Sequence, residues 1–355
     1  MNLDTPDLFM RLAAERPAVL LYGMGNGADK IIAELESRGV PVAGVFASDG
    51  FVRGQIFHGM RVRSFSEIRA AYDPHGTVIL LSFGSARPEV LESICRVAEA
   101  FPLLVPDMPV CGGPLFDSAF ARAHAEEIAA ARALLADEPS RELYDRILSF
   151  RLSGSLTTLL EAVSHESAWD ILKRSPVTVR RIADLGAYTG DSAREAMAHF
   201  PLEFILAAEP DRRNFKKLSA WREGVADCTV ECHMVAVCDR VGEAAFDASG
   251  NRNAGLCTGR AATTVATATP DSLLQGRAVD YIKYDVEGAE QQALLGTAES
   301  IRAHRPALRV AAYHRSADLF EIPLLLARLC ENYDLYLTRE RSVPAWDIDV
   351  VAIPR

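Results

Sequence analysis

The chain alternates short apolar runs with longer amphipathic segments, a pattern that predicts strands alternating with helices. In the first hundred residues the apolar runs are AVLLYG (from Ala18), VPVAGVFASD (to Asp49) and TVILLSFG (from Thr77). One amphipathic segment stops at Gly39, and another spans roughly residues 88–100. Strands and helices in alternation are typical of a parallel α/β sheet with short crossovers. We therefore predict an N-terminal Rossmann-like α/β domain over residues 1–111.

An alanine-rich stretch of helical period follows over residues 112–176. Pro139 interrupts this period, because proline cannot continue a helix interior. We expect one helix before the break and a second from Ser140, with Ser140 as its N-cap. These residues are predicted to form a helical linker.

Seven further apolar runs follow from Val177, and the last two are separated only by a short loop that predicts a hairpin. The runs are VRRIADLG, EFILAAE, TVECHMVAV, DYIKYD, ALRVAAYH, YDLYLTRE and DIDVVAIP. Seven strands ending in a hairpin match the class I methyltransferase sheet better than a six-stranded dinucleotide fold. The predicted fold class is therefore α/β, with a seven-stranded Rossmann-like sheet over residues 177–355.

The composition of the chain limits which classes of partner and compartment we expect for the protein. The chain has 355 residues, is 49% hydrophobic and carries a formal net charge of −10, which suits a two-domain globular protein and argues against a nucleic-acid substrate. None of the seven cysteines has zinc-site spacing, so we expect buried thiols in a reducing compartment. The first residues include Asp4 and no basic region, and no apolar run is long enough to span a bilayer. We expect a cytoplasmic protein without a membrane span, and self-association stays open.

The first candidate site follows the strand that ends in Asp184. Gly186 and Gly190 form a turn there, and Asp191 starts the next helix. Such a turn lets a ligand approach the backbone closely. Glu209 ends the next strand with Pro210 directly behind it, and a carboxylate in this position can accept two hydrogen bonds from a ribose diol. The pattern points to S-adenosylmethionine rather than to a dinucleotide.

Four segments resemble the FkbM family of S-adenosylmethionine-dependent methyltransferases: DLGAYTGDS, AAEPDRRNFKKL, DYIKYDVEGAEQQALLG and AAYHRSADLFEIP. The resemblance covers the chain from about Val177. It implies O-methylation of a sugar, glycan intermediate or natural product. It also implies a cofactor site, to which we assign Asp184, Gly186, Ala187, Tyr188, Gly190, Asp191, Glu209, Pro210 and Ala236. Tyr188 stands where the broader class has a glycine, which predicts a less permissive turn with an aromatic ring over the cofactor.

The acceptor hydroxyl must be aligned and lose its proton. Asp285 and His314 end neighbouring strands, and we predict His314 as a general base of near-neutral pKa with Asp285 orienting it. Glu287 either joins these catalytic residues or caps the helix after it. Lys283 shares a strand face with Asp285, which predicts an ion pair. Asp285, Glu287 and His314 could also hold a divalent metal, although the motif does not require one, and we assign none.

Two alternatives stay open. One is an NAD-dependent oxidoreductase that uses the first turn, Gly23-x-Gly25-x-x-Ala28, with Asp49 on the ribose. The other is a non-catalytic nucleotide- or sugar-binding protein, in which both α/β units serve recognition or assembly.

Overall fold

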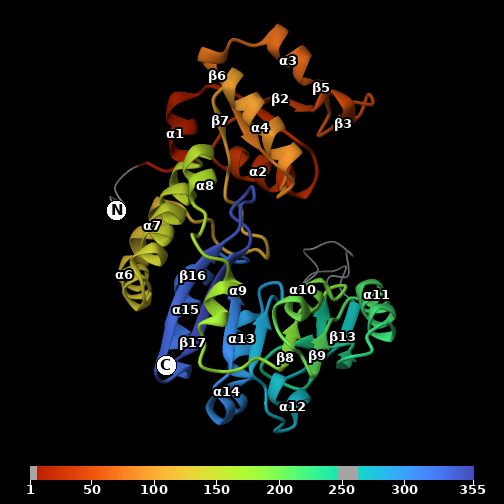
Figure 1. Ribbon diagram of the computed structural model, residues 1–355. Coiled ribbons are helices and arrows are strands. Elements are labelled where there is room, and N and C mark those ends of the chain that lie inside the picture. The colour runs from red at the N-terminus through yellow and green to blue at the C-terminus, as the bar shows by residue number, and fades with distance from the viewer. Residues whose placement is uncertain (1–5, 247–262) are drawn as a thin grey trace.

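The computed structural model describes residues 6–246 and 263–355 (Figure 1). Asp4, which we cited above in the prediction of a cytoplasmic protein, lies outside these ranges. In Figure 1 a small N-terminal sheet lies above a larger sheet, with helices α6 and α7 beside the larger one. Within the described ranges every helix falls short of the length or hydropathy that a membrane span requires.

The N-terminal sheet is parallel, with strand order β5-β2-β1-β6-β7. The strands are β1 (Ala18–Tyr22), β2 (Val42–Ala47), β5 (Arg63–Ser64), β6 (Thr77–Leu81) and β7 (Leu103–Leu104), and β3 (Ile56–Phe57) and β4 (Met60–Arg61) form a separate hairpin. The helices are α1 (Leu8–Glu15), α2 (Asn26–Ser37), α3 (Phe65–Ala71) and α4 (Pro88–Ala100), with short 3-10 turns at Asp49–Phe51 and Pro74–Gly76. The strands predicted here are confirmed, although the second ends before Asp49. Because β2 and β6 flank β1 on opposite sides, the strand order reverses between β1 and β6.

Residues 112–176 are helical, as predicted, but their longest helix begins at Glu138 and not after Ser140. It contains α5 (Ser118–Ala123), α6 (Ala125–Leu134), α7 (Glu138–Ser153), α8 (Leu156–Glu161) and α9 (Ala168–Lys173). Helix α7 is capped by Asp137, whose carboxylate accepts a hydrogen bond from the Ser140 N–H at 3.0 Å. The prediction of Ser140 as N-cap is wrong, because Pro139 fits the first helical turn, where no N–H is needed. The Ser140 hydroxyl instead accepts from the Leu337 N–H at 3.0 Å.

The larger sheet confirms the seven predicted strands and their order is β10-β9-β8-β14-β15-β17-β16. Its strands are β8 (Arg181–Leu185), β9 (Phe204–Ala208), β10 (Thr229–His233), β14 (Tyr281–Tyr284), β15 (Ala307–Ala311), β16 (Tyr333–Arg339) and β17 (Ile348–Pro354). Its helices are α10 (Asp191–His199), α11 (Arg212–Glu223), α12 (Pro270–Leu274), α13 (Glu290–Leu295), α14 (Ala298–His304) and α15 (Asp318–Leu329). Strand β17 pairs antiparallel with β15 and β16, as the predicted hairpin requires. The order reverses between β8 and β14.

One predicted strand is divided. The run TVECHMVAV forms β10 in the larger sheet and β11 (Ala236–Val237) in a separate three-stranded sheet. That sheet also contains β12 (Gly242–Phe246) and β13 (Thr263–Ala268), which the sequence pattern did not predict. Ala236 therefore follows the end of a strand of the larger sheet instead of lying on it.

One hydrophobic cluster runs through the whole fold. It includes Leu20 of the N-terminal sheet, Tyr144 of α7, and Leu185 and Val310 of the larger sheet, all buried. A backbone bridge adds to this contact, because Ser85 and Val343 exchange N–H···O bonds of 2.7 and 3.0 Å. The helical residues 112–176 are thus packed into a core shared with both sheets. The three-part domain division stays a prediction.

Candidate functional site

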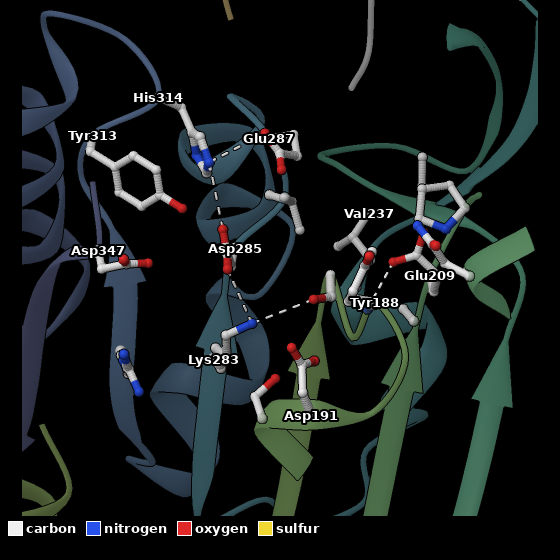
Figure 2. Close-up of a pocket in the computed structure, with 18 of the residues that line it drawn as sticks. Tyr188, Asp191, Glu209, Val237, Lys283, Asp285, Glu287, Tyr313, His314 and Asp347 are labelled. Atoms are coloured by element: carbon white, nitrogen blue, oxygen red, sulfur yellow. Dashed lines mark hydrogen bonds and ion pairs between the residues drawn. The ribbon is translucent and has the colours of Figure 1, made fainter. Parts of the chain in front are cut away.

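A cavity of about 300 Å³ opens at the carboxyl ends of β8, β9, β14 and β15 (Figure 2). This is the reversal point of the strand order, where ligands bind in open α/β sheets. The structure brings together here most of the predicted site residues: Gly186, Tyr188, Asp191, Glu209, Pro210, Ala236, Asp285, Glu287 and His314. Asp184, Ala187 and Gly190 do not line this cavity.

The turn after β8 is tightly fixed. The N–H groups of Gly186 and Ala187 both donate to the Ala208 carbonyl, at 3.0 and 2.9 Å. Gly186 has φ +82°, and a Cβ there would lie 1.8 Å from the Asp285 carbonyl oxygen. Gly190 likewise has φ +81° and packs against the Trp221 ring. Tyr188 adopts φ +49° without being a glycine, and it lines the cavity (Figure 2).

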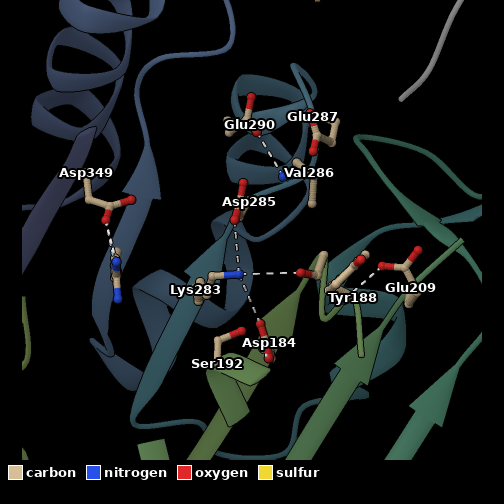
Figure 3. Close-up of polar contacts among 12 residues, drawn as sticks. Asp184, Tyr188, Ser192, Glu209, Lys283, Asp285, Val286, Glu287, Glu290 and Asp349 are labelled. Atoms are coloured by element: carbon tan, nitrogen blue, oxygen red, sulfur yellow. Dashed lines mark hydrogen bonds and ion pairs between the residues drawn. The ribbon is translucent and has the colours of Figure 1, made fainter. Parts of the chain in front are cut away.

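Asp184 is 2% exposed and holds the floor of the site (Figure 3). Its carboxylate accepts a hydrogen bond from Ser192 Oγ at 2.9 Å and lies 3.5 Å from Lys283 Nζ. Lys283 Nζ also lies 3.3 Å from Asp285 Oδ2, which confirms the predicted ion pair. One buried ammonium group therefore compensates two carboxylates at the ends of adjacent strands.

Glu209 lies on the opposite wall and is 6% exposed. Its Oε2 accepts from the Tyr188 N–H at 2.9 Å (Figure 3). Its Oε1 accepts from the Asp211 N–H, also at 2.9 Å. Burial raises the pKa of Glu209 to about 7, and these hydrogen bonds only partly oppose that effect. Each carboxylate oxygen keeps a further lone pair that a ligand hydroxyl can use.

His314 is enclosed by carboxylates and is 1% exposed. Its Nε2 lies 3.6 Å from Asp285 Oδ1 and 3.4 Å from Glu287 Oε2 (Figure 2). Its Nδ1 lies 2.9 Å from Glu290 Oε1. Burial alone would lower the pKa of His314, but the three carboxylates outweigh it and raise the pKa to about 10. The expectation of a near-neutral histidine is therefore wrong: the imidazole is charged at neutral pH.

Glu287 faces the cavity from a strained position, with φ +52°. It does not cap the next helix, because α13 begins at Glu290 with Ala289 before it. Burial raises the pKa of Glu287 to about 8; nearby His314 lowers it, and Asp285 and Glu290 raise it. Left-handed backbone at non-glycine residues is often found at functional sites.

Sequence reasoning missed several residues of this site. Glu290 is 1% exposed and also accepts from the Val286 and Gly288 N–H groups, at 2.9 and 3.3 Å. Glu290 could have been predicted as a site residue from the DVEGAE motif, because this short segment contains three acidic residues. Further missed residues line the cavity: Tyr313 lies in the AAYHRSADLFEIP segment, and Val110, Arg309, Trp346 and Asp347 lie outside the quoted motifs.

A metal-ligand geometry is present in the described part of the chain. Ligand atoms of Asp285, Glu290 and His314 lie within 4.8 Å of one another. The same atoms are accounted for by the hydrogen bond and ion pairs around His314, and we assign no metal to them.

The first glycine turn does not form a dinucleotide site. A Cβ on Gly23 would lie 2.6 Å from the Phe83 ring, which fills the space in front of the turn. The Asp49 carboxylate accepts from Ser66 Oγ at 2.6 Å and does not line the cavity beside this turn. The cavity beside this turn measures about 130 Å³, well below the 300–1,000 Å³ typical of ligand pockets of drug size. The geometry therefore disfavours NAD at this position.

Comparisons with known proteins agree with the geometry of the larger sheet. Residues 184–335 match the sequence model of the methyltransferase FkbM domain. The methyltransferase FkbM of Methylobacillus flagellatus KT superposes with a TM-score of 0.70 at 18% identity, covering 99% of this chain and 94% of that chain. No curated protein sequence matches the chain.

Two further solved structures share only a distant similarity with this fold. An rRNA methylase of Streptococcus thermophilus has a TM-score of 0.35 at 8% identity, covering 53% of this chain and 93% of its own. A fibrillarin of Aeropyrum pernix with natively bound S-adenosyl-L-methionine has a TM-score of 0.32 at 12% identity, covering 52% and 73%.

The seven-stranded sheet, its reversal point and the cavity there have the Rossmann-like fold of methyltransferases. Residues 184–335, a little under half of the chain, match the methyltransferase FkbM domain, and this match supports an S-adenosylmethionine-dependent methyltransferase. The resemblance inferred from the sequence is confirmed.

Proposed function

We propose that the protein transfers the methyl group of S-adenosylmethionine to a hydroxyl of a sugar, glycan intermediate or natural product. The observation that carries this proposal is the placement of Glu209 and Asp285 on opposite walls of one cavity. In this proposal, one cavity holds both the carboxylate that binds the ribose and the carboxylates that act on the acceptor. When bound, S-adenosylmethionine supplies an electrophilic methyl group on a sulfonium.

The walls near Glu209 fit a nucleoside. Both oxygens of Glu209 are fixed by backbone N–H donors and can still accept from a ribose diol. Gly186 leaves the backbone bare at the centre of the cavity, where any side chain would meet the Asp285 carbonyl. Pro210 and Ala236 line the same end with small apolar groups, as an adenine ring requires.

The opposite end fits a hydroxyl acceptor. His314 is charged near neutral pH, so we assign it to electrostatic positioning in place of the general-base role expected from the sequence. Glu287 has a pKa of about 8, and a base is most effective when its pKa lies near the working pH. We therefore assign the acceptor proton to the Glu287 carboxylate, while Asp285 and His314 orient the hydroxyl.

Calorimetry with S-adenosylhomocysteine tests this function, with NADH titrated in parallel. We expect binding of the homocysteine compound, weakened by about 1–3 kcal/mol in Glu209→Ala because its hydrogen bonds are lost. Binding of NADH alone would favour an oxidoreductase. Binding of S-adenosylhomocysteine without methyl transfer to any hydroxyl acceptor would favour a non-catalytic protein.

A further inference from the structure

A second cavity lies at the reversal point of the N-terminal sheet. It measures about 130 Å³ and is bounded by the start of α2, the end of β6, the segment after β7 and the loop between β16 and β17. The first two of these come from β1 and β6, between which the strand order reverses. Both sheets therefore present a cavity at the position where α/β sheets bind ligands.

The two cavities share a wall. Val110 and Trp346 line both of them. Trp346 is seated on Gly84, where a Cβ would lie 2.2 Å from its ring, and the Ser85–Val343 bridge joins the same two loops. The two cavities are therefore neighbours, with Val110 and Trp346 at their common boundary.

The second cavity carries an uncompensated positive charge. Lys30 lines it, and its Nζ donates to the carbonyls of Pro109 and Val110 at 2.7 and 2.9 Å. Among the described residues no carboxylate forms an ion pair with Lys30; its neighbour Asp29 is paired with His58 at 2.7 Å. An ammonium group has three N–H donors, so one remains for a ligand.

The size of the cavity limits what can enter. Its volume equals that of roughly four waters, each with about 30 Å³ of liquid. That is room for a phosphate or carboxylate group, with or without part of a sugar ring, and not for a nucleotide.

We propose that this second cavity is an anion subsite for the methyl acceptor, in which Lys30 binds a phosphate or carboxylate group of the same molecule whose hydroxyl is methylated. The proposal rests on the proposed function, because it places the reacting hydroxyl in the first cavity. In this proposal the N-terminal sheet makes the enzyme selective for acidic acceptor molecules over neutral ones.

A binding experiment tests the subsite directly. Inorganic phosphate and, separately, acetate are titrated into the full chain, and tryptophan fluorescence is followed because Trp346 lines the cavity. We expect a saturable change with one of the two anions, at least tenfold weaker in Lys30→Met and retained in Lys30→Arg. The stronger anion identifies the acidic group. No saturable change, or equal binding by Lys30→Met, overturns the proposal.

Control variants distinguish anion binding in the cavity from binding to surface lysines and from the effects of misfolding. Lys217→Met removes an exposed lysine of α11 and should leave anion binding unchanged; equal loss there would overturn the subsite. Because Lys30 holds the Pro109 and Val110 carbonyls, Lys30→Met could disturb the fold. Asn26→Phe therefore provides a second variant, which fills the cavity from an exposed position with Lys30 intact and should also weaken binding.

A turnover experiment links the subsite to the acceptor. Glucose, glucose 1-phosphate and glucuronic acid are offered with S-adenosylmethionine. We expect a KM at least tenfold lower for an acidic sugar than for glucose, and Lys30→Met should remove this difference. Equal KM values in the native protein overturn the proposal, and if no sugar is methylated the anion titration decides.

The two proposals fail separately. Binding of S-adenosylhomocysteine without binding of either anion refutes the subsite alone. Binding of an anion at Lys30 without binding of S-adenosylhomocysteine refutes the proposed function.

Discussion

The backbone carbonyl of Asp285 occupies the position that a side chain on Gly186 would need, only 1.8 Å from an ideal Cβ. The turn after β8 and the end of β14 are therefore in direct backbone contact across the reversal point of the sheet. This contact fixes the turn that we assign to the cofactor against the strand end that we assign to the acceptor.

Gly186→Ala should be strongly destabilising. The substitution adds a clash with backbone to the strain of a side chain at φ +82°, and we expect a loss of roughly 3 kcal/mol in the free energy of unfolding. Urea denaturation measures it. Gly276→Ala is the matched control, because Gly276 has φ +76° with nothing within 4 Å and should lose only about 1 kcal/mol. Equal losses would mean that the contact with Asp285 contributes nothing.

Lys283→Met should destabilise the protein by about 3–5 kcal/mol, because the Asp184 and Asp285 carboxylates lose their buried counter-ion. Chemical denaturation at pH 7 checks this. The same change at exposed Lys216 should stay within about 0.5 kcal/mol. Adding Asp184→Asn to Lys283→Met should restore part of the loss; no recovery would argue against the ion pair as the cause.

Cofactor affinity should depend on pH through Glu209. Its carboxyl has a pKa of about 7 in the free protein, so below pH 7 it gains a proton and loses an acceptor site. The Kd of S-adenosylhomocysteine should rise about tenfold between pH 8 and pH 6, one unit on each side of the pKa. Glu209→Gln should bind more weakly and show a flat profile in calorimetry. A native profile without this slope would remove Glu209 from ribose binding.

Methyl transfer should increase with pH as Glu287 loses its proton. Because burial raises this pKa to about 8, kcat/KM should rise through pH 7 and level off above pH 8. Glu287→Gln should slow transfer by about 10²–10⁴-fold and leave S-adenosylhomocysteine affinity unchanged. If the Glu287→Gln variant stays active with the native pH profile, Glu287 is not the base. If the His314→Gln variant has unaltered activity, His314 has no positioning role.

Local pattern was sufficient for most of the fold. The seven strands of the larger sheet are apolar runs such as FILAA and YIKY, because strands covered on both faces must be apolar throughout. The three-stranded sheet was not predicted, since β12 (GEAAF) has no such run and β11 is only two residues long. Ser140 was mistaken for a cap because Asp137, the actual cap, lies before a proline that the helix accommodates.

The site was predictable where a residue lies at a strand end, and less so elsewhere. Glu209, Asp285 and His314 follow from strand order alone, because parallel strands end at the same edge. The charge state of His314 does not, since it depends on Glu290 across the turn. Trp346 comes from a loop between antiparallel strands, and only the folded chain brings that loop to the cavity.

The shared hydrophobic cluster has a consequence for how substrates enter. Leu20, Tyr144 and Val310 belong to one continuous interior, so the two sheets cannot swing apart without exposing it. We therefore expect the separation between the two cavities to stay constant, so that an acceptor able to occupy both would need a matching length.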